Sequence, residues 1–371
     1  MKQHNKIKAI ISGGGTGGHI FPAISIANEL MKRNPETEIL FVGALGRMEM
    51  ERVPAAGYRI EGLPVSGFQR RLTLKNISVV INLFKSLKIA DNILNDFKPQ
   101  IVIGVGGYAS GPLLRRASRK GIPTLLQEQN SYAGVTNKLL AKKAKRICVA
   151  YKDMEKYFPP EKIVLTGNPV RDIRISENLR SEGLTHFGFN AQKPVLVVMG
   201  GSLGARTINM AMLKNITEIC GSGIQVLWQT GKYYFDDIRN KLADIKIPEL
   251  KVTDFITRMD LAYNIADLLV SRAGAISISE ICLTGRAAIL VPSPNVAEDH
   301  QTKNAMALVR ESAAIMVRDN EAENHLMEKI QELIHDKEKL SDLKFNSLKM
   351  AKPDATSHIV DEIYNILGFK E

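Results

Sequence analysis

The chain has 371 residues, more than one compact core usually holds, and its 44% hydrophobic and 24% charged residues predict a globular protein of two domains. Its three distant cysteines, Cys148, Cys220 and Cys282, exclude a disulfide framework or a zinc ribbon and indicate a reducing compartment. The net charge of +11 is uneven, because residues 1–170 hold 26 Lys and Arg against 12 Asp and Glu, whereas residues 171–371 hold 24 against 27, so the first half predicts an anionic partner.

The first half of the chain alternates short apolar strands with helices. Such alternation predicts a parallel sheet covered by helices on both faces. We expect strands at 7–11, 39–43, 101–105, 123–126 and 146–149, and helices at 22–33 and 76–94, the first with Pro22 in its first turn.

The second half repeats the opening pattern of strand, glycine loop and helix. A strand at 194–199 leads into a glycine loop at 200–205, and further strands are expected at 225–229, 251–255, 268–271 and 287–291. We therefore expect two similar doubly wound α/β domains, residues 1–170 and 171–352. A last helix at about 355–367, within a C-terminal segment 353–371, is expected to pack back on the first domain.

Three glycine-rich loops each follow a strand and open a helix, at 13–19, 104–112 and 200–205. Glycines let a backbone approach a ligand, and a helix N-terminus offers N–H groups to an anion. The first loop also fits G-x-G-x-x-G, but residues 41–44 lack the acid that binds the ribose of a dinucleotide. No G-K-[ST] follows any of these loops, which excludes a P-loop. We expect the loops to line a cleft between the domains, with anion sites on both walls.

Two side chains next to these loops could do chemistry. His19 lies where the first loop enters its helix, and a neutral imidazole there could accept a proton from a hydroxyl, although a capping or packing role is an equal alternative. Glu280 lies in the first turns of the helix after 271–274, where it would accept hydrogen bonds from a ribose or remain a solvated acid. The chain has no D-x-D pair, so a leaving diphosphate would meet N–H groups, helix ends or a cation such as Arg171 rather than a metal.

A membrane surface is one candidate for the anionic partner. The N-terminus has no signal-peptide core, and the uncharged stretch 99–114 is too short to span a bilayer. Apolar residues form a stripe on the helix at 76–94, which either contacts lipid or faces the core; they are Ile77, Val80, Ile81, Phe84 and Leu87. Basic residues flank this helix and continue at 138–146, as a peripheral membrane contact requires. Nucleic acid is disfavoured, because no recognition motif is present and aromatic residues make up 6%.

Taken together, the motifs resemble the MurG family of N-acetylglucosaminyltransferases in peptidoglycan synthesis. The resemblance runs almost end to end, and it rests on GGGTGGHIFPA at 13–23, GVGGYASGP at 104–112, QEQN at 127–130, AGVTNKLLA at 133–141, TGNPVR at 166–171, GGSLGA at 200–205, SRAGAISISE at 271–280 and HQTKNA at 300–305. It implies a GT-B fold, a transfer of N-acetylglucosamine from UDP-N-acetylglucosamine to lipid I with inversion, and no cofactor or metal. It also implies a peripheral position on the cytoplasmic side of the inner membrane, with room for wall-synthesis protein partners.

The resemblance also assigns expected roles to individual residues. His19 is the expected base, and the acceptor, bound mainly by the first domain, is expected to contact Tyr108 and Asn137. The expected donor-binding residues are Thr16, Gly17, Gly18, Asn130, Arg171, Ser202, Ile256, Ala275, Ile276, Ser277, Ile278, Ser279, Glu280 and Gln301. Leu203 departs from the family, in which many members carry Gln. Alternatives are another GT-B enzyme with a different acceptor, a nucleotide-binding regulator at the membrane and, more distantly, a nicotinamide dehydrogenase.

Overall fold

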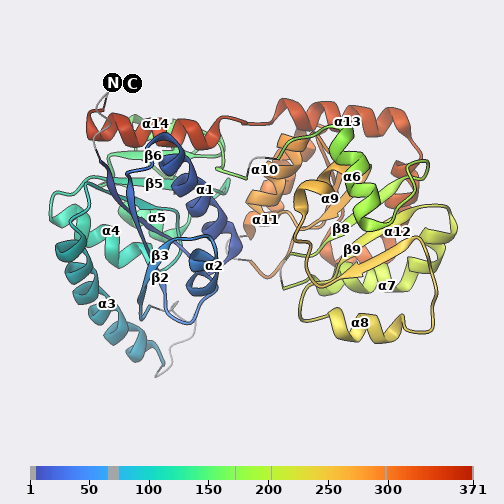
Figure 1. Cartoon of the computed structure of the whole chain (residues 1–371), viewed down its shortest axis with the longest axis horizontal. Helices are drawn as coiled ribbons and strands as arrows, with labels where there is room; N and C mark the ends of the chain where they lie inside the picture. The colour runs from blue at the N-terminus through green and yellow to red at the C-terminus, as the bar shows by residue number, and fades with distance from the viewer. Residues whose placement is uncertain (1–5, 66–74, 172, 202, 297–298, 370–371) are drawn as a thin grey trace. The chain divides into compact units, whose positions relative to one another are not determined.

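A computed structural model describes residues 6–65, 75–171, 173–201, 203–296 and 299–369. The chain forms two compact units, and the C-terminal segment belongs to the first of them. Unit 1 contains Met1–Arg171 and Pro353–Glu371, and unit 2 contains Asp172–Lys352 (Figure 1).

Unit 1 is built on a seven-stranded sheet in the order β3-β2-β1-β4-β5-β6-β7, with every neighbouring pair parallel. The strands are β1 (Lys8–Ser12), β2 (Glu38–Ala44), β3 (Arg59–Leu63), β4 (Ile101–Gly104), β5 (Thr124–Glu128), β6 (Arg146–Val149) and β7 (Ile163–Leu165). Ser12 pairs with Gly104 of the neighbouring strand, so the glycine loops that follow β1 and β4 begin side by side.

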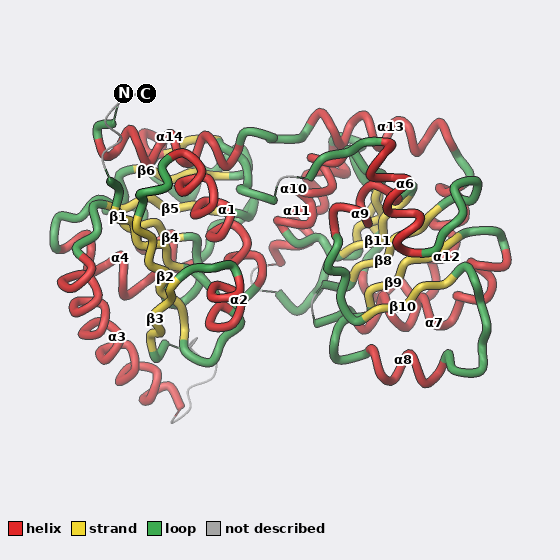
Figure 2. The backbone as a smooth tube through the Cα atoms, viewed as in Figure 1, coloured by secondary structure: helices red, strands yellow, loops and turns green. Residues whose placement is uncertain are grey.

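Helices cover both faces of this sheet (Figure 2). One face packs against α1 (Gly17–Arg33), α2 (Glu49–Ala55) and α14 (Ala355–Leu367), and the other against α3 (Lys75–Phe97), α4 (Ser110–Arg119) and α5 (Val135–Leu140). Alternate strand residues face opposite layers: Ile10 packs with α3 and α4, whereas Ile11 packs with α1. The α14 helix is fixed by Arg33, whose guanidinium lies 2.6 Å from the Asp361 carboxylate.

Unit 2 repeats this arrangement on a six-stranded parallel sheet in the order β10-β9-β8-β11-β12-β13. Its strands are β8 (Val195–Met199), β9 (Gln225–Gln229), β10 (Leu250–Thr253), β11 (Leu268–Ser271), β12 (Ala288–Leu290) and β13 (Ile315–Met316). The helices on one face are α6 (Glu177–Phe187), α9 (Met259–Ile265), α10 (Ala275–Thr284) and α11 (His300–Arg310); those on the other are α7 (Arg206–Gly221), α8 (Phe235–Lys241) and α12 (Ala322–Ile334), and α13 (Lys337–Lys349) contacts α10 and α12.

The predicted pair of doubly wound parallel sheets is confirmed, but two details of the prediction are wrong. The first helix begins at Gly17 rather than Pro22, so the proline lies inside it. Pro22 removes only the bond that would reach the Gly18 carbonyl, one turn from the helix start, so the helix tolerates it. The short strands β3, β7 and β13 were missed, because edge strands of two to five residues carry little apolar periodicity.

Candidate active site

The two glycine loops of unit 1 meet at the point where the strand order reverses between β1 and β4. Ligands of open α/β sheets bind at such a point, outside the carboxyl ends of the strands. A Cβ atom on Gly107, whose φ is +83°, would lie 2.6 Å from the Gly14 carbonyl oxygen, so only glycine permits this backbone contact. A Cβ atom on Gly106 would likewise lie 2.8 Å from the His19 ring. The second loop therefore packs directly against the first loop and its histidine.

The hydrogen bonds of His19 determine which ring nitrogen is basic. Its Nδ1 lies 3.0 Å from the Gly14 carbonyl oxygen and 3.3 Å from the Thr16 hydroxyl. A carbonyl can only accept, so Nδ1 carries the proton and donates it to Gly14. In the neutral ring this leaves Nε2 as the basic nitrogen. The loop thus holds His19 in the tautomer that a general base requires.

The start of α1 has the properties of an anion site. Thr16 is the N-cap residue, but its side chain makes no capping bond, and the first turn holds no acid. Thr16 and Gly18 are exposed, so an anion could approach this helix start. The Arg171 guanidinium lies 5.4 Å from the centre of the Phe21 ring, which itself packs against Gly17. This stacking brings a positive charge to the same end of the helix.

A buried carboxylate, Glu49, supports the first loop and was missed by the sequence analysis. It is 1% exposed and accepts the N–H groups of Gly15 and Ala44, each at 2.9 Å. A Cβ atom on Gly14 would lie 2.0 Å from this carboxylate, so the loop is packed tightly over it. Nothing in the sequence links Glu49 to residues 34 positions earlier, because α2 brings it there only in the fold.

A second buried carboxylate, Glu128, organises the QEQN segment. It accepts the N–H of Gly134 at 2.9 Å, the Asn137 side-chain amide at 2.9 Å and the N–H of Asn130 at 3.2 Å. Burial raises the pKa of Glu128, and these donors oppose the rise. Asn137 is 2% exposed and its amide nitrogen also donates to the Gln127 carbonyl, which gives it a positioning role in this loop. Tyr108, by contrast, is 60% exposed beside the second loop.

In unit 2 the expected donor-binding residues follow the carboxyl ends of β8, β10, β11 and β12, around the reversal of strand order between β8 and β11. Ser202 lies outside the described residues. Its neighbour Gly204 has a φ of +89°, and a Cβ atom there would lie 2.2 Å from the Thr230 carbonyl oxygen. Ile256, which follows β10, is 3% exposed, so any contact with a base would have to use its backbone.

The α10 helix presents a second start without an acid or a capping side chain. Its N-cap is Gly274, and Ala275, Ile276, Ser277, Ile278 and Ser279 form the first turns. Glu280 is only 4% exposed, so the alternative of a solvated acid is wrong. The Tyr263 hydroxyl donates to Glu280 Oε2 at 2.9 Å and fixes the carboxylate, a role that sequence reasoning missed.

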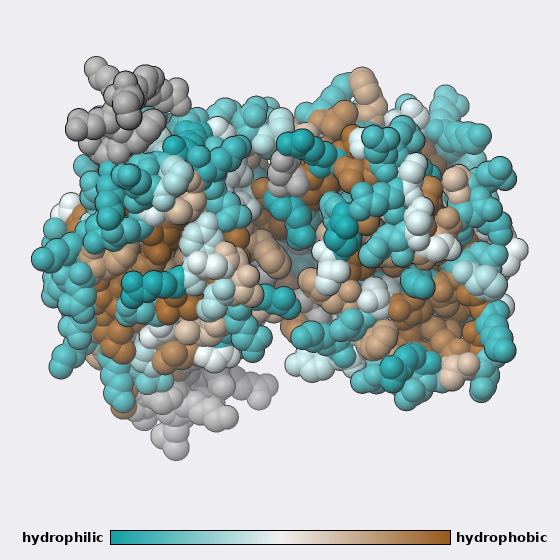
Figure 3. All heavy atoms as spheres, in the orientation of Figure 1, coloured by the Kyte–Doolittle hydropathy of each residue, from teal (hydrophilic) through white to brown (hydrophobic). Residues whose placement is uncertain are grey.

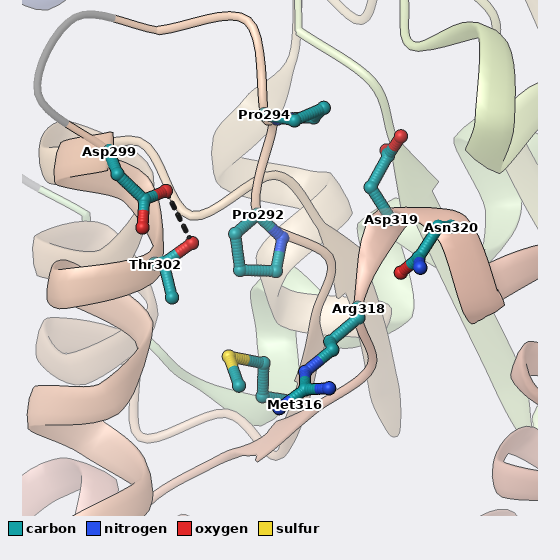
Figure 4. A pocket seen from close by; sticks show the side chains of 8 residues that line it. All are labelled: Pro292, Pro294, Asp299, Thr302, Met316, Arg318, Asp319 and Asn320. Carbon is teal, nitrogen blue, oxygen red and sulfur yellow. Dashed lines mark hydrogen bonds between the residues drawn. The ribbon is translucent and has the colours of Figure 1, made fainter.

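A small cavity of about 220 Å³ opens where β12 and β13 end (Figure 4). Pro292, Asp299, Thr302 and Asp319 are among its lining residues, and the Thr302 hydroxyl donates to Asp299 at 2.7 Å across its rim. Gln301 lies beside this rim, and its side-chain oxygen accepts the N–H of Ser293 at 2.9 Å. These contacts fix the turn at the start of α11.

Comparison with known proteins covers both units. Residues 9–149 match the glycosyltransferase family 28 N-terminal domain, and residues 195–359 match its C-terminal domain. A protein of Parabacteroides distasonis is 56% identical and covers 98% of this chain and 100% of the relative. The chain belongs to glycosyltransferase family 28. This membership confirms the predicted enzyme class, a hexosyltransferase of GT-B fold.

Two further relatives place the chain within the family. The P. distasonis protein and one of Cytophaga hutchinsonii, 54% identical over 99% of each chain, are both named UDP-N-acetylglucosamine--N-acetylmuramyl-(pentapeptide) pyrophosphoryl-undecaprenol N-acetylglucosamine transferase. The crystal structure of Acinetobacter baumannii MurG is similar with a TM-score of 0.73 and 28% identity, covering 97% of this chain and 99% of that one. The resemblance to the MurG family is thereby confirmed.

Proposed function

We propose that this family 28 enzyme transfers N-acetylglucosamine from UDP-N-acetylglucosamine to the C4 hydroxyl of the N-acetylmuramoyl sugar of lipid I, giving lipid II for peptidoglycan synthesis. The observation that carries the proposal is the 56% identity over the full length of a relative named for this transfer. In each unit, a helix start without a capping side chain lies near the point where the strand order reverses. These two helix starts support the proposal, because a helix N-terminus binds anions and both reactants carry diphosphates.

In the proposed reaction the hydroxyl oxygen attacks C1 of the donor sugar from the face opposite UDP. The new C1–O bond forms as the bond from C1 to the β-phosphate oxygen breaks, so the α-linked donor gives a β-1,4 product and UDP leaves with the bonding electrons. His19 Nε2 takes the hydroxyl proton, because Nδ1 is committed to the Gly14 carbonyl. Tyr108, exposed next to this loop, would contact the acceptor, while Asn137 would hold the loop around Asn130.

Unit 2 is proposed to bind the nucleotide. Glu280, fixed by Tyr263, would accept both ribose hydroxyls, and the backbone of Ile256 would contact the uracil. The residues from Ala275 to Ser279 would surround the nucleoside, and Gln301 would contact the donor sugar. The charge of the departing diphosphate would be met by Ser202, Arg171 and the start of α1 from Thr16 to Gly18, in place of a metal ion.

The transfer itself is the first test. With radiolabelled UDP-N-acetylglucosamine and lipid I, we expect labelled lipid II to form, and the rate to be unchanged by EDTA, because the proposed diphosphate contacts are all protein groups. Separation of the lipid products by chromatography measures both. No labelled lipid would overturn the proposed function, and a rate abolished by EDTA and restored by Mg²⁺ would overturn only the metal-free mechanism.

We further propose that unit 1 contacts the inner membrane surface. Every helix in the described part of the chain is too short or too polar to cross a bilayer. On α3, Val80, Ile81 and Phe84 are 41%, 50% and 68% exposed, and Lys85 and Lys88 are exposed beside them. Leu87 is half-buried, and the side chain of Ile77 lies outside the described residues. Hydrophobic atoms lie among hydrophilic ones over this helix in Figure 3. Apolar side chains ringed by lysines suit an anionic lipid surface.

The same face of unit 1 carries a second exposed apolar pair. Val135 and Leu139 on α5 are 61% and 78% exposed, with Lys142 and Lys143 exposed just after the helix. Both α3 and α5 cover one side of the sheet, so their exposed residues would approach a bilayer from the same face. This arrangement favours the lipid-contact alternative for the stripe on α3.

Removing this apolar surface should release the protein from vesicles. The double substitution Ile81→Ser and Phe84→Ser should weaken partitioning into vesicles containing phosphatidylglycerol by roughly 10–100-fold, since each side chain contributes about 1.5–3 kcal/mol when fully buried and about half of that when a membrane surface buries it only in part. Sedimentation with vesicles measures it. Tyr233→Ser, at an aromatic residue of unit 2 that is 78% exposed, is the matched control. Partitioning that is equal in the double variant and the control would refute the proposed contact surface.

A further inference from the structure

Unit 2 has a second cavity, of about 400 Å³, at the end of α10 that is remote from its proposed nucleotide-binding start. It lies between the last residues of α10 and the α13 helix, and Ile175, Leu283, Arg286, Lys344, Phe345 and Leu348 are among its lining residues. The first cavity-lining residue of α10, Leu283, lies eight residues after Ala275, which at about 1.5 Å per residue is roughly 12 Å along the helix. None of the proposed donor-binding residues lines the cavity, and no step of the transfer uses it.

The floor of the cavity is positively charged. Arg286 donates to the carbonyl oxygens of Ala266 and Asn264, at 3.3 and 3.5 Å, so its outer nitrogens cap the end of α9. Its Nε is buried and has no hydrogen-bond partner among the described residues. A buried N–H without an acceptor is destabilising, so a small movement of the side chain that let an outside acceptor reach this nitrogen would be favourable.

The second cation, Lys344, has no ion pair within the described part of the chain. Burial lowers the pKa of Lys344; Asp267 opposes this shift, and Arg286 and Arg180 add to it. Asp267 is already engaged, because it lies 3.2 Å from Arg180 and accepts the Val195 N–H at 2.9 Å. Burial lowers the pKa of Arg286, and the negative charges of Asp267 and Glu177 oppose this shift. The positive charge around the cavity is therefore incompletely balanced.

The rim of the cavity is apolar. Ile175, Phe345 and Leu348 are 43%, 61% and 54% exposed, although large apolar side chains are normally withdrawn from water when a fold can cover them. An apolar rim above a cationic floor complements a molecule that carries one anionic group on an apolar chain.

We propose that this cavity binds an anionic amphiphile, with a phosphate or carboxylate head on Arg286 and Lys344 and an apolar chain against Ile175, Phe345 and Leu348. Capping of α9 gives the outer nitrogens of Arg286 their hydrogen-bond acceptors. It gives no acceptor to Nε of Arg286 and does not explain why Lys344 lies at the cavity. Ile175 lies three residues after Asp172, where unit 2 begins, and Leu348 lies four residues before Lys352, where it ends. The bound molecule would thus contact both segments through which the chain enters and leaves unit 2.

Protection of Lys344 from an amine-acylating reagent tests the proposal on the full chain. Octyl phosphate, below its micelle concentration, should slow acylation of Lys344 at least fivefold, as measured by peptide mass spectrometry. Exposed Lys214 on α7 is the internal control and should be unaffected. Inorganic phosphate should protect less, for lack of a chain, and octyl glucoside should not protect, for lack of a charge. Equal acylation of Lys344 with and without octyl phosphate would overturn the proposal.

Two variants test the binding of the anionic head group and of the apolar chain separately. Lys344→Met keeps the apolar stem and should weaken octyl phosphate binding about tenfold by calorimetry, whereas Lys214→Met should leave it unchanged. Phe345→Ser should weaken octyl phosphate binding but not inorganic phosphate binding. Affinity for octyl phosphate that is unchanged in Lys344→Met would also overturn the proposal. Protection of Lys344 by phosphatidate vesicles would identify a bilayer lipid as the source, and protection by dispersed octyl phosphate alone would identify a free metabolite.

Discussion

Replacing His19 with alanine should lower the turnover number by about 10²–10⁴-fold while UDP binding stays near normal. The bond from Nδ1 to the Gly14 carbonyl leaves Nε2 as the only ring nitrogen that can take a proton from the acceptor. Steady-state rates of lipid II formation give the turnover number, and calorimetric titration with UDP gives the affinity. A variant that retains near-normal turnover would remove His19 from the mechanism.

A second variant separates the base from its structural role. In His19→Asn the side-chain amide can still donate to the Gly14 carbonyl, but it offers no basic nitrogen. We expect the same loss as in the alanine variant, together with loss of the acidic limb of the pH–rate profile that a histidine base produces. His325→Ala, at an exposed histidine on α12, should keep wild-type rates. Recovery of activity in His19→Asn would assign the histidine to packing of the loop instead.

The general organisation of both units could be predicted from the sequence because the cause is local. Each strand, glycine loop and helix start is encoded within about ten neighbouring residues, and the repeat of this pattern at Gly200 identifies the second unit. Proximity of loops could also be inferred, because the carboxyl ends of parallel strands share one edge of a sheet. His19 and Glu280 were found in this way, since both follow such loops.

The groups that hold these loops in place were missed because they come from distant parts of the chain. Glu49 reaches Gly15 from the next helix along, and Tyr263 reaches Glu280 from α9. Neither contact leaves a spacing or a composition that could signal it. For the same reason the sequence left open which way the apolar stripe on α3 faces. The periodicity marks one side of a helix, whereas the burial of Val79 and the exposure of Phe84 depend on the elements that pack against α3 in the fold.

Buried carboxylates appear twice under the substrate-facing loops proposed for unit 1, and they share one physical role. Glu49 accepts two backbone N–H groups beneath the first loop, and Glu128, itself in the QEQN segment, accepts donors from Asn130, Gly134 and Asn137. A buried acid satisfied in this way fixes backbone that would otherwise lose its hydrogen bonds to water. The loops that would meet the substrates are therefore held by side chains that do not themselves touch a substrate.

Glu280→Ala should raise the dissociation constant for UDP by at least about 10–100-fold, because the net loss of even one hydrogen bond from a ribose hydroxyl to a carboxylate costs about 1.5–3 kcal/mol. Turnover at saturating donor should fall far less, since the ribose lies away from the reacting C1. Calorimetry gives the affinity and initial rates give the turnover number. Donor affinity equal to that of the wild type would refute the ribose role.

Alanine at this position also leaves the buried Tyr263 hydroxyl without its acceptor, so a structural loss must be distinguished from a lost ligand contact. Glu280→Gln keeps an oxygen that accepts from Tyr263 and removes the charge, and Tyr263→Phe keeps the carboxylate and removes its anchor. If Glu280 binds the ribose, both glutamine and alanine should weaken UDP binding, while Tyr263→Phe weakens it only modestly. If Glu280 serves only to hold α9 against α10, Tyr263→Phe should lower the melting temperature as much as Glu280→Ala does, and Glu280→Gln should bind UDP normally.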